Sequence, residues 1–194
     1  MGILDRLVAA ALPMTPRSIV RIVAKRYIAG ETIDEAVARV GQLNELGVLG
    51  TIDALGEFVK DRAMARAETE RCIAVIDRIR AVRVGSGISV KLTSIGLDID
   101  VGLCRDHLRE ILAHAASRDV FVRIDMENTP YTDVTLSLAR EMWEQFPMSV
   151  GVVLQAYLHR TLADCQDIGP TGMSVRLCKG IYVESESISY KNRD

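Results

Sequence analysis

The sequence lacks the spacing of cysteine and histidine that a structural metal site needs. The four cysteines stand at 72, 104, 165 and 178, and the three histidines at 107, 114 and 159. Zinc sites draw their ligands from short, clustered spacings such as C-x-x-C, and no such spacing is present. We therefore expect no metal, and cysteines that are reduced and mostly buried, as in a cytosolic protein.

The sequence also lacks a tract of one charge and a long apolar run. Lys and Arg number 24 against 26 Asp and Glu, for a net charge of −2, which argues against a nucleic-acid partner. No apolar run reaches the ~18 residues of a membrane-spanning helix. Residues 7–12 are apolar but follow Asp5 and Arg6 without a basic n-region, so they make a poor signal peptide. The expected location is the cytoplasm.

Two phosphate-binding motifs and the usual nucleophile pairs are missing as well. The chain contains neither G-x-G-x-x-G nor G-x-x-x-x-G-K-[ST], which excludes the standard dinucleotide fingerprint and the P-loop. No Ser-His or Cys-His pair is placed for nucleophilic catalysis, and the histidines fall on expected helices. A Schiff-base lysine at Lys91 is conceivable in a barrel, but a nearby acid would hold it protonated.

Short apolar runs rich in β-branched residues alternate with amphipathic stretches. The runs, each about the length of a strand, cover residues 48–55, 88–93, 120–125, 150–156 and 173–178. Helical stripes lie between them, for example Leu108, Ile111, Leu112 and Ala115. Runs such as VGVVLQA are apolar at the positions that face either side of a strand, as in parallel strands covered by helices. The pattern predicts an α/β fold with a parallel sheet.

No linker divides the chain, so we expect a single domain over residues 1–194. Residues 1–47 are a helical segment: one short helix is expected at 3–12, and another starts at the capping box Thr32–Glu35 and ends at Gly47. Residues 48–194 carry five βα units, the last followed by a helix that starts near Glu184 and breaks off. Five units make either a complete doubly wound sheet or part of an eight-stranded barrel, which needs ~250 residues.

Polar residues follow four of the expected strands in succession. The strand ends read KLT (91–93), DMEN (125–128), QAY (155–157) and RLCKGIY (176–182). Ligands of parallel sheets bind at these carboxyl ends. Lys91 and Arg176 interrupt apolar strands, where a charge is costly unless it is paired, and Asp125 is the natural partner for one or both. Cations around one carboxylate suit an anionic substrate or a phosphate-bearing cofactor.

These segments resemble the proline dehydrogenase family, particularly the bacterial single-function enzymes. The resemblance covers residues 20 to 190 in collinear order. It is carried by AKRYIAGETIDEAV (24–37), GTIDALGE (50–57), SVKLTSIGL (89–97), FVRIDMEN (121–128), VGVVLQAYL (150–158) and VRLCKGIYVE (175–184). The joint occurrence of R-L-x-K-G-x-Y, Q-A-Y-L and I-D-M-E is highly specific. Cys178 and Ile181 stand where the family more often has Val and Ala.

The resemblance implies a distorted (βα)8 TIM-type barrel that holds FAD at the strand ends and oxidises L-proline to 1-pyrroline-5-carboxylate by hydride transfer to the flavin. Electrons then pass to a quinone, usually through peripheral membrane association. Lys91 would hold the proline carboxylate, and Tyr182 would face the substrate. Asp125 would pair with Lys91, and Arg176 would stabilise the reduced flavin. The implied flavin contacts are Met126 and Gln155, and the phosphate-binding turn is Lys179, Gly180 and Ile181.

Against that family the barrel is incomplete, because three βα units would follow. We therefore expect a fragment whose parent protein carries the activity, with weak substrate binding and an unpaired strand edge that favours insolubility. Two other interpretations stay open. One is a different, flavin-free protein that binds another anion at the same strand ends. The other is an inactive remnant, or a piece that acts only with a complementing C-terminal chain.

Overall fold

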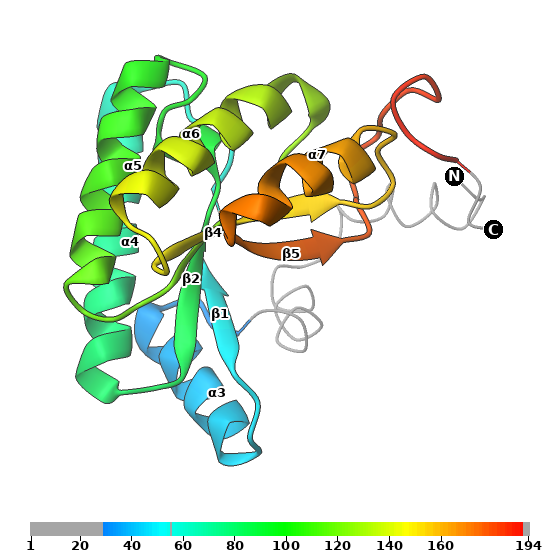
Figure 1. Cartoon of the computed structure of the whole chain (residues 1–194). Helices are drawn as coiled ribbons and strands as arrows, with labels where there is room; N and C mark the ends of the chain where they lie inside the picture. Colours follow the sequence, from blue (N-terminus) through cyan, green and yellow to red (C-terminus); the bar gives the residue numbers. More distant parts are fainter. Residues whose placement is uncertain (1–28, 55, 192–194) are drawn as a thin grey trace, which may run out of the picture.

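The computed structural model describes residues 29–54 and 56–191. Five parallel strands form one sheet in the order β1-β2-β3-β4-β5. The strands are β1 (Gly50–Asp53), β2 (Ser86–Val90), β3 (Val122–Ile124), β4 (Val150–Gln155) and β5 (Ser174–Cys178). Strand direction turns strongly from β1 and β2 to β4 and β5, so the sheet is curled (Figure 1). The predicted α/β class and the parallel sheet are confirmed.

Helices cover the outer side of the curled sheet (Figure 1). They are α3 (Ile33–Glu45), α4 (Arg62–Val82), α5 (Val101–Ala116), α6 (Thr132–Gln145) and α7 (Thr161–Ile168), with 3-10 turns at η2 (Leu92–Ile95), η3 (Thr129–Tyr131) and η4 (Gly169–Thr171). The capping box of Thr32 and Glu35 is formed, and Gly47 adopts a φ of 76° after the helix, as predicted. The expected short helix at residues 3–12 lies outside the described residues.

The helical stripes expected from the sequence form the outer core. All four residues of the α5 stripe are buried, and so are Leu138 and Met142 of α6. Every residue of β4 is buried, which agrees with its apolar pattern on both faces. Each large aliphatic side chain buried in this way contributes ~2 kcal/mol to stability. The apolar core therefore lies between the helices and the outer face of the sheet, and the polar residues lie on the inner face.

Strand register sorts the inward-facing residues into levels, because side chains alternate between the two faces. The lower level aligns Asp53, Ser89, Arg123, Gly151 and Ser174 across all five strands. Two residues further along, the middle level brings together Lys91, Asp125, Val153 and Arg176. The upper level holds Gln155 and Cys178. The charged residues Lys91, Asp125 and Arg176, from β2, β3 and β5, thus reach one height at the carboxyl end of the sheet, with Asp53 one level below.

Several predicted boundaries are wrong. Strand β2 begins at Ser86 and ends at Val90, and Leu92–Ile95 is a 3-10 turn. The chain turns there because Thr93 bonds to Glu127 instead of continuing the ladder. The helix expected near Glu184 is also wrong.

Residues 186–188 form a turn instead, and Ser189 makes an antiparallel bridge with Leu158. The backbone N–H of Tyr190 donates to Tyr157 O. Backbone groups that would bond to one another within a helix are therefore bonded to the loop between β4 and α7. His159, expected on a helix, lies in that loop between β4 and α7. In the part of the chain that is described, β5 therefore has no helix after it.

Candidate active site

Four charged residues of alternating sign form a row across the inner face of the sheet; we call Asp53, Lys91, Asp125 and Arg176 the charge row. Lys91 Nζ lies 2.6 Å from Asp53 Oδ2 and 3.6 Å from Asp125 Oδ2. Arg176 Nη2 donates to Asp125 Oδ1 over 2.5 Å, and Arg176 Nη1 lies 3.5 Å from Ser89 Oγ. The sequence expectation that Asp125 pairs with one or both cations is confirmed for both.

The two central members of the charge row are largely shielded from water. The side chains of Lys91 and Asp125 are 13% and 15% exposed. Burial alone would lower the pKa of Lys91, but its hydrogen bond to Asp53 and the charges of Asp53 and Asp125 outweigh this, and the pKa is raised. Burial raises the pKa of Asp125, against the opposing charges of Arg176 and Lys91. Lys91 is therefore held as an ammonium ion, which disfavours a Schiff-base role.

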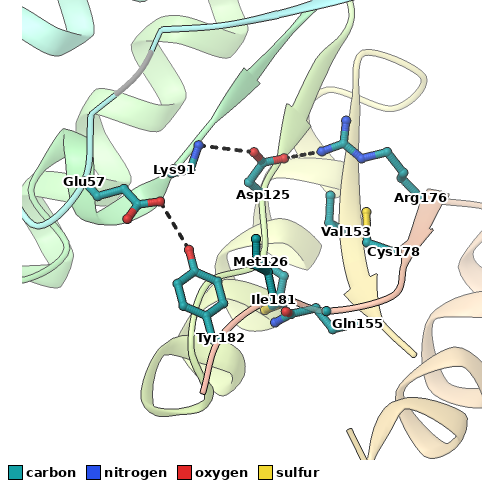
Figure 2. Close-up of a pocket in the computed structure, with 11 residues that line it drawn as sticks. Glu57, Lys91, Asp125, Met126, Val153, Gln155, Arg176, Cys178, Ile181 and Tyr182 are labelled. Carbon is teal, nitrogen blue, oxygen red and sulfur yellow. Dashed lines mark hydrogen bonds and ion pairs between the residues drawn. The ribbon is translucent and has the colours of Figure 1, made fainter. Parts of the chain in front are cut away.

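Three members of the charge row, Lys91, Asp125 and Arg176, line a cavity of about 260 Å³. Its walls are Glu57, Lys91, Asp125, Met126, Val153, Gln155, Arg176, Cys178, Gly180, Ile181 and Tyr182 (Figure 2). All the predicted site residues are among them except Lys179, which is exposed beside the cavity. The cavity is slightly smaller than pockets that enclose a whole drug-sized ligand, so it fits a small amino acid or one ring of a larger molecule.

The wall opposite the charge row comes from two distant segments. Tyr182 Oη donates to Glu57 Oε1 over 3.3 Å, which joins the segment after β1 to the segment after β5 (Figure 2). Burial, together with the charge of Glu57, raises the pKa of Tyr182, so its hydroxyl stays a donor. Thr93 fixes the first segment, because its Oγ1 accepts from Phe58 N over 3.0 Å.

A buried carboxylate connects the strand ends beside the cavity. Glu127 is fully buried; its Oε1 accepts from Thr93 Oγ1 over 2.5 Å and its Oε2 from Thr93 N over 3.1 Å. Gln155 Nε2 donates to the backbone oxygen of Glu127 over 2.8 Å. Burial raises the pKa of Glu127 despite the bonds from Thr93. This network ties the ends of β2, β3 and β4 together.

Sequence reasoning missed Asp53 and Glu57. Both stand in the GTIDALGE segment, and Asp53 is the last residue of β1. The polar strand ends predicted from the sequence begin at the second strand, and the first run, 48–55, is described only as apolar. Applying the strand-end rule to the first strand as well would have found Asp53.

The residues around the cavity fit a flavin. Arg176 Nε is buried and finds no acceptor among the described residues, so it has an N–H to offer a ligand. Met126, Val153 and Ile181 supply apolar surface for a ring system. Gly180 has a φ of 105° and follows the exposed cation Lys179, which suits an approaching phosphate. Among the described residues there is neither a group of three metal-ligating side chains nor a helix long and apolar enough to cross a membrane.

Comparison with known proteins points the same way. The family model described as "Proline dehydrogenase" matches residues 36–194. Proline dehydrogenase 1 of Bacillus subtilis (strain 168) is 39% identical over 173 residues, which are 89% of this chain and 57% of that protein. The proline dehydrogenase of Deinococcus radiodurans is 33% identical over 174 residues, 88% of this chain and 56% of that protein. The chain thus spans less than three fifths of the length of these relatives.

The fold has a counterpart among solved structures. Proline utilization A (PutA) from Bdellovibrio bacteriovorus, inactivated by N-propargylglycine, superposes with a TM-score of 0.77 at 23% sequence identity. The match covers 84% of this chain and 21% of that protein. The family model covers most of the chain, including every strand and each member of the charge row, and we conclude that this chain belongs to the proline dehydrogenase family.

Proposed function

We propose that the protein oxidises L-proline to 1-pyrroline-5-carboxylate with FAD as the hydride acceptor, the first step in the degradation of proline to glutamate. The observation that carries the proposal is the charge row beside a small, partly apolar cavity, in a member of this family. A small zwitterion needs a cation for its carboxylate and apolar surface for its ring, and this cavity offers both.

Lys91 is the residue that binds the substrate carboxylate. An ammonium group has three hydrogens. Asp53 accepts one of them over 2.6 Å, and Asp125 at 3.6 Å is an ion-pair partner without a hydrogen bond, so N–H groups remain for a ligand. Tyr182 closes the other side and faces the substrate, with its hydroxyl oriented by Glu57.

Arg176 and its neighbours face the cofactor. FAD, when bound, supplies the acceptor for the hydride. Arg176 is fixed by Asp125 and offers its unpaired Nε–H to the flavin, where a cation stabilises developing negative charge. Met126 and Gln155 contact the ring system, and Lys179, Gly180 and Ile181 hold the phosphates. Asp125 thereby orients the substrate-binding cation and the flavin-facing cation together.

The remaining features of the family complete the proposal. Further βα units close the sheet into a (βα)8 barrel, since β1 and β5 are both edge strands in the described part of the chain. The electrons pass to a quinone, and the protein works in the cytoplasm, peripherally associated with the inner face of the cell membrane.

The test is flavin absorbance of the purified protein. We expect a bound-flavin spectrum that L-proline bleaches without air, that D-proline leaves unchanged, and that a soluble quinone restores. Arg176→Lys should weaken FAD binding at least 10-fold, because a point charge cannot replace the paired guanidinium. Arg140→Lys, at an exposed ion pair with Asp167, is the matched control. A colourless protein that binds another anion would overturn the proposal and favour a flavin-free enzyme.

A second candidate function is that of a piece completed by a separate chain. Edge strand β5 exposes Val175 and Leu177, at 38% and 59%. Apolar side chains at a strand edge need a covering element. Co-expression with the C-terminal βα units of a relative tests this candidate: flavin binding that appears only in the co-expressed pair supports it, and flavin binding by the chain alone rules it out.

A further inference from the structure

Tyr157 contacts the segment after β5 at several points. Its backbone N–H donates to Lys179 O over 3.1 Å, and its backbone oxygen accepts from Tyr190 N over 2.8 Å. Its hydroxyl donates to Tyr182 O over 3.0 Å. Burial raises the pKa of Tyr157, so the hydroxyl remains a donor. One residue of the β4–α7 loop therefore bonds to both ends of residues 179–182, which we call the β5 turn.

The ring of Tyr157 also lies directly on Gly180. A Cβ atom at position 180 would overlap the ring at Cδ1, Cε1 and Cγ. Gly180 has a φ of 105°, a conformation that other residues rarely adopt. The β5 turn and the ring are thus complementary. The backbone conformation at position 180 favours glycine, and the absence of a side chain there leaves room for the ring of Tyr157.

The contact continues along the chain beyond the turn. His159 N donates to Ile188 O over 3.0 Å, and Leu158 pairs with Ser189. These later contacts fix residues 188–190 but do not touch the β5 turn. The side chain of Tyr157, in contrast, contacts both Gly180 and Tyr182.

We propose that Tyr157 is the positioning residue of the β5 turn: it fixes Lys179, Gly180, Ile181 and Tyr182 in the arrangement that receives the cofactor and the substrate. The inference rests on the proposed function for its ligands, but the ordering of the turn itself does not depend on it. Tyr157 is not among the residues that line the cavity. Its effect is therefore on affinity and not on the chemical step.

Three variants separate the ring from the hydroxyl. Tyr157→Phe keeps the ring on Gly180 and loses one neutral hydrogen bond, so FAD affinity should fall about 3- to 10-fold. Tyr157→Ala loses both contacts, so FAD affinity and KM for proline should each worsen by more than 30-fold, with kcat at saturation within about 3-fold of the wild type. Tyr190→Phe, on an exposed ring of the same segment, is the matched control and should leave all three quantities unchanged.

Hydrogen exchange of the protein without added flavin supplies a readout that is independent of activity. In Tyr157→Ala the backbone amide of residue 157, which donates to Lys179 O, should exchange at least 10-fold faster, while the amides of β1 to β3 keep the wild-type rate. Tyr157→Phe should recover most of this protection.

The two proposals can fail separately. Unchanged exchange in Tyr157→Ala would overturn the positioning role, and so would a loss of kcat with unchanged affinities. A protein whose turn loosens as expected but which binds no FAD would overturn the proposed function alone. If Tyr157→Ala does not fold, Tyr157→Leu decides, because it also removes the ring and the hydroxyl: faster exchange of the residue 157 amide supports the role, and a wild-type rate excludes it.

Discussion

Lys91 lies closer to Asp53 than to Asp125, at 2.6 Å against 3.6 Å. Asp53 is the last residue of β1, and Lys91 comes directly after the last residue of the neighbouring strand β2. Their ion pair therefore joins the carboxyl ends of these two strands. The shorter contact makes Asp53 the stronger partner of the proposed substrate-binding ammonium group, although it does not line the cavity.

Asp53→Asn should therefore destabilise the protein by ~1–3 kcal/mol, because Lys91 is largely buried and loses its closest counter-charge. Urea unfolding measures the change in the free energy of unfolding. Asp34→Asn, which removes an exposed ion pair with Arg78, should cost less than ~1 kcal/mol. Equal losses in the two variants would show that the Lys91–Asp53 pair has no special weight.

Lys91→Met should raise KM for L-proline by roughly 10- to 100-fold, since it removes a charge-assisted hydrogen bond to the substrate carboxylate. The flavin spectrum should persist, because Arg176 remains paired with Asp125. Steady-state kinetics and absorbance on one preparation measure both quantities. Loss of the flavin with an unchanged KM would reverse the roles assigned to Lys91 and Arg176.

Glu127 gives stability a specific pH dependence. Its pKa is raised in the folded protein, so as the pH falls through that raised value the folded state binds a proton before the unfolded state does, and stability increases. The gain is complete below the ordinary glutamate pKa of about 4.3. Glu127→Gln lacks this group. The difference in unfolding free energy, wild type minus variant, should thus increase as the pH falls from neutral to the ordinary glutamate pKa of about 4.3.

Glu110 provides the control with the opposite sign. The hydrogen bond from Arg66 lowers its pKa, so its contribution is present above the ordinary pKa and is lost as the pH falls through the lowered value. The difference between wild type and Glu110→Gln should therefore shrink on acidification. If both differences in unfolding free energy changed in the same direction on acidification, burial would not determine the pKa of Glu127.

The sequence predicted the elements that depend on local pattern. The α5 stripe of Leu108, Ile111 and Leu112 is buried as its period requires, and the apolar run of β4 is covered on both faces. The capping box at Thr32 needs only residues three apart, so it was also predictable. Polar residues at strand ends were expected to meet because parallel strands end at one edge, and the cavity confirms that they do.

What the sequence did not predict depends on long-range contacts. Asp53 approaches Lys91 only through strand register, and Glu57 meets Tyr182 across 125 residues of chain. The segment after β5 was expected to be helical, but Tyr157 and His159 bond to its backbone instead. Such pairings are set by the tertiary structure, and no local periodicity encodes them.

Leu177 is predicted to drive self-association of the chain. It is 59% exposed on edge strand β5, where unpaired backbone groups favour pairing with another molecule. Leu177→Lys should shift sedimentation toward the monomer. Leu162→Lys is the matched control, because Leu162 is 71% exposed on helix α7 and has no strand edge. If both variants shifted sedimentation equally, the effect would come from the added surface charge and not from the loss of pairing at the edge of β5.

The four free cysteines should react in two classes. Cys72 and Cys104 are buried, which raises the pKa of each thiol to about 12, so they should react only on unfolding. Cys165 and Cys178 are partly exposed and should react in the native protein. A colorimetric thiol titration counts both classes. Cys178 lines the cavity, so FAD should slow its reaction and leave Cys165 unaffected.

The alternation of inward and outward side chains determines where the chain tolerates a change of length. One codon inserted within β2 would turn Lys91 from the inner face toward the outer helices and break the charge row. The connections that lead into the strands, at residues 83–85, 117–121 and 146–149, lie at the opposite edge of the sheet. Insertions and deletions can accumulate there while every charged group at the carboxyl edge keeps its position.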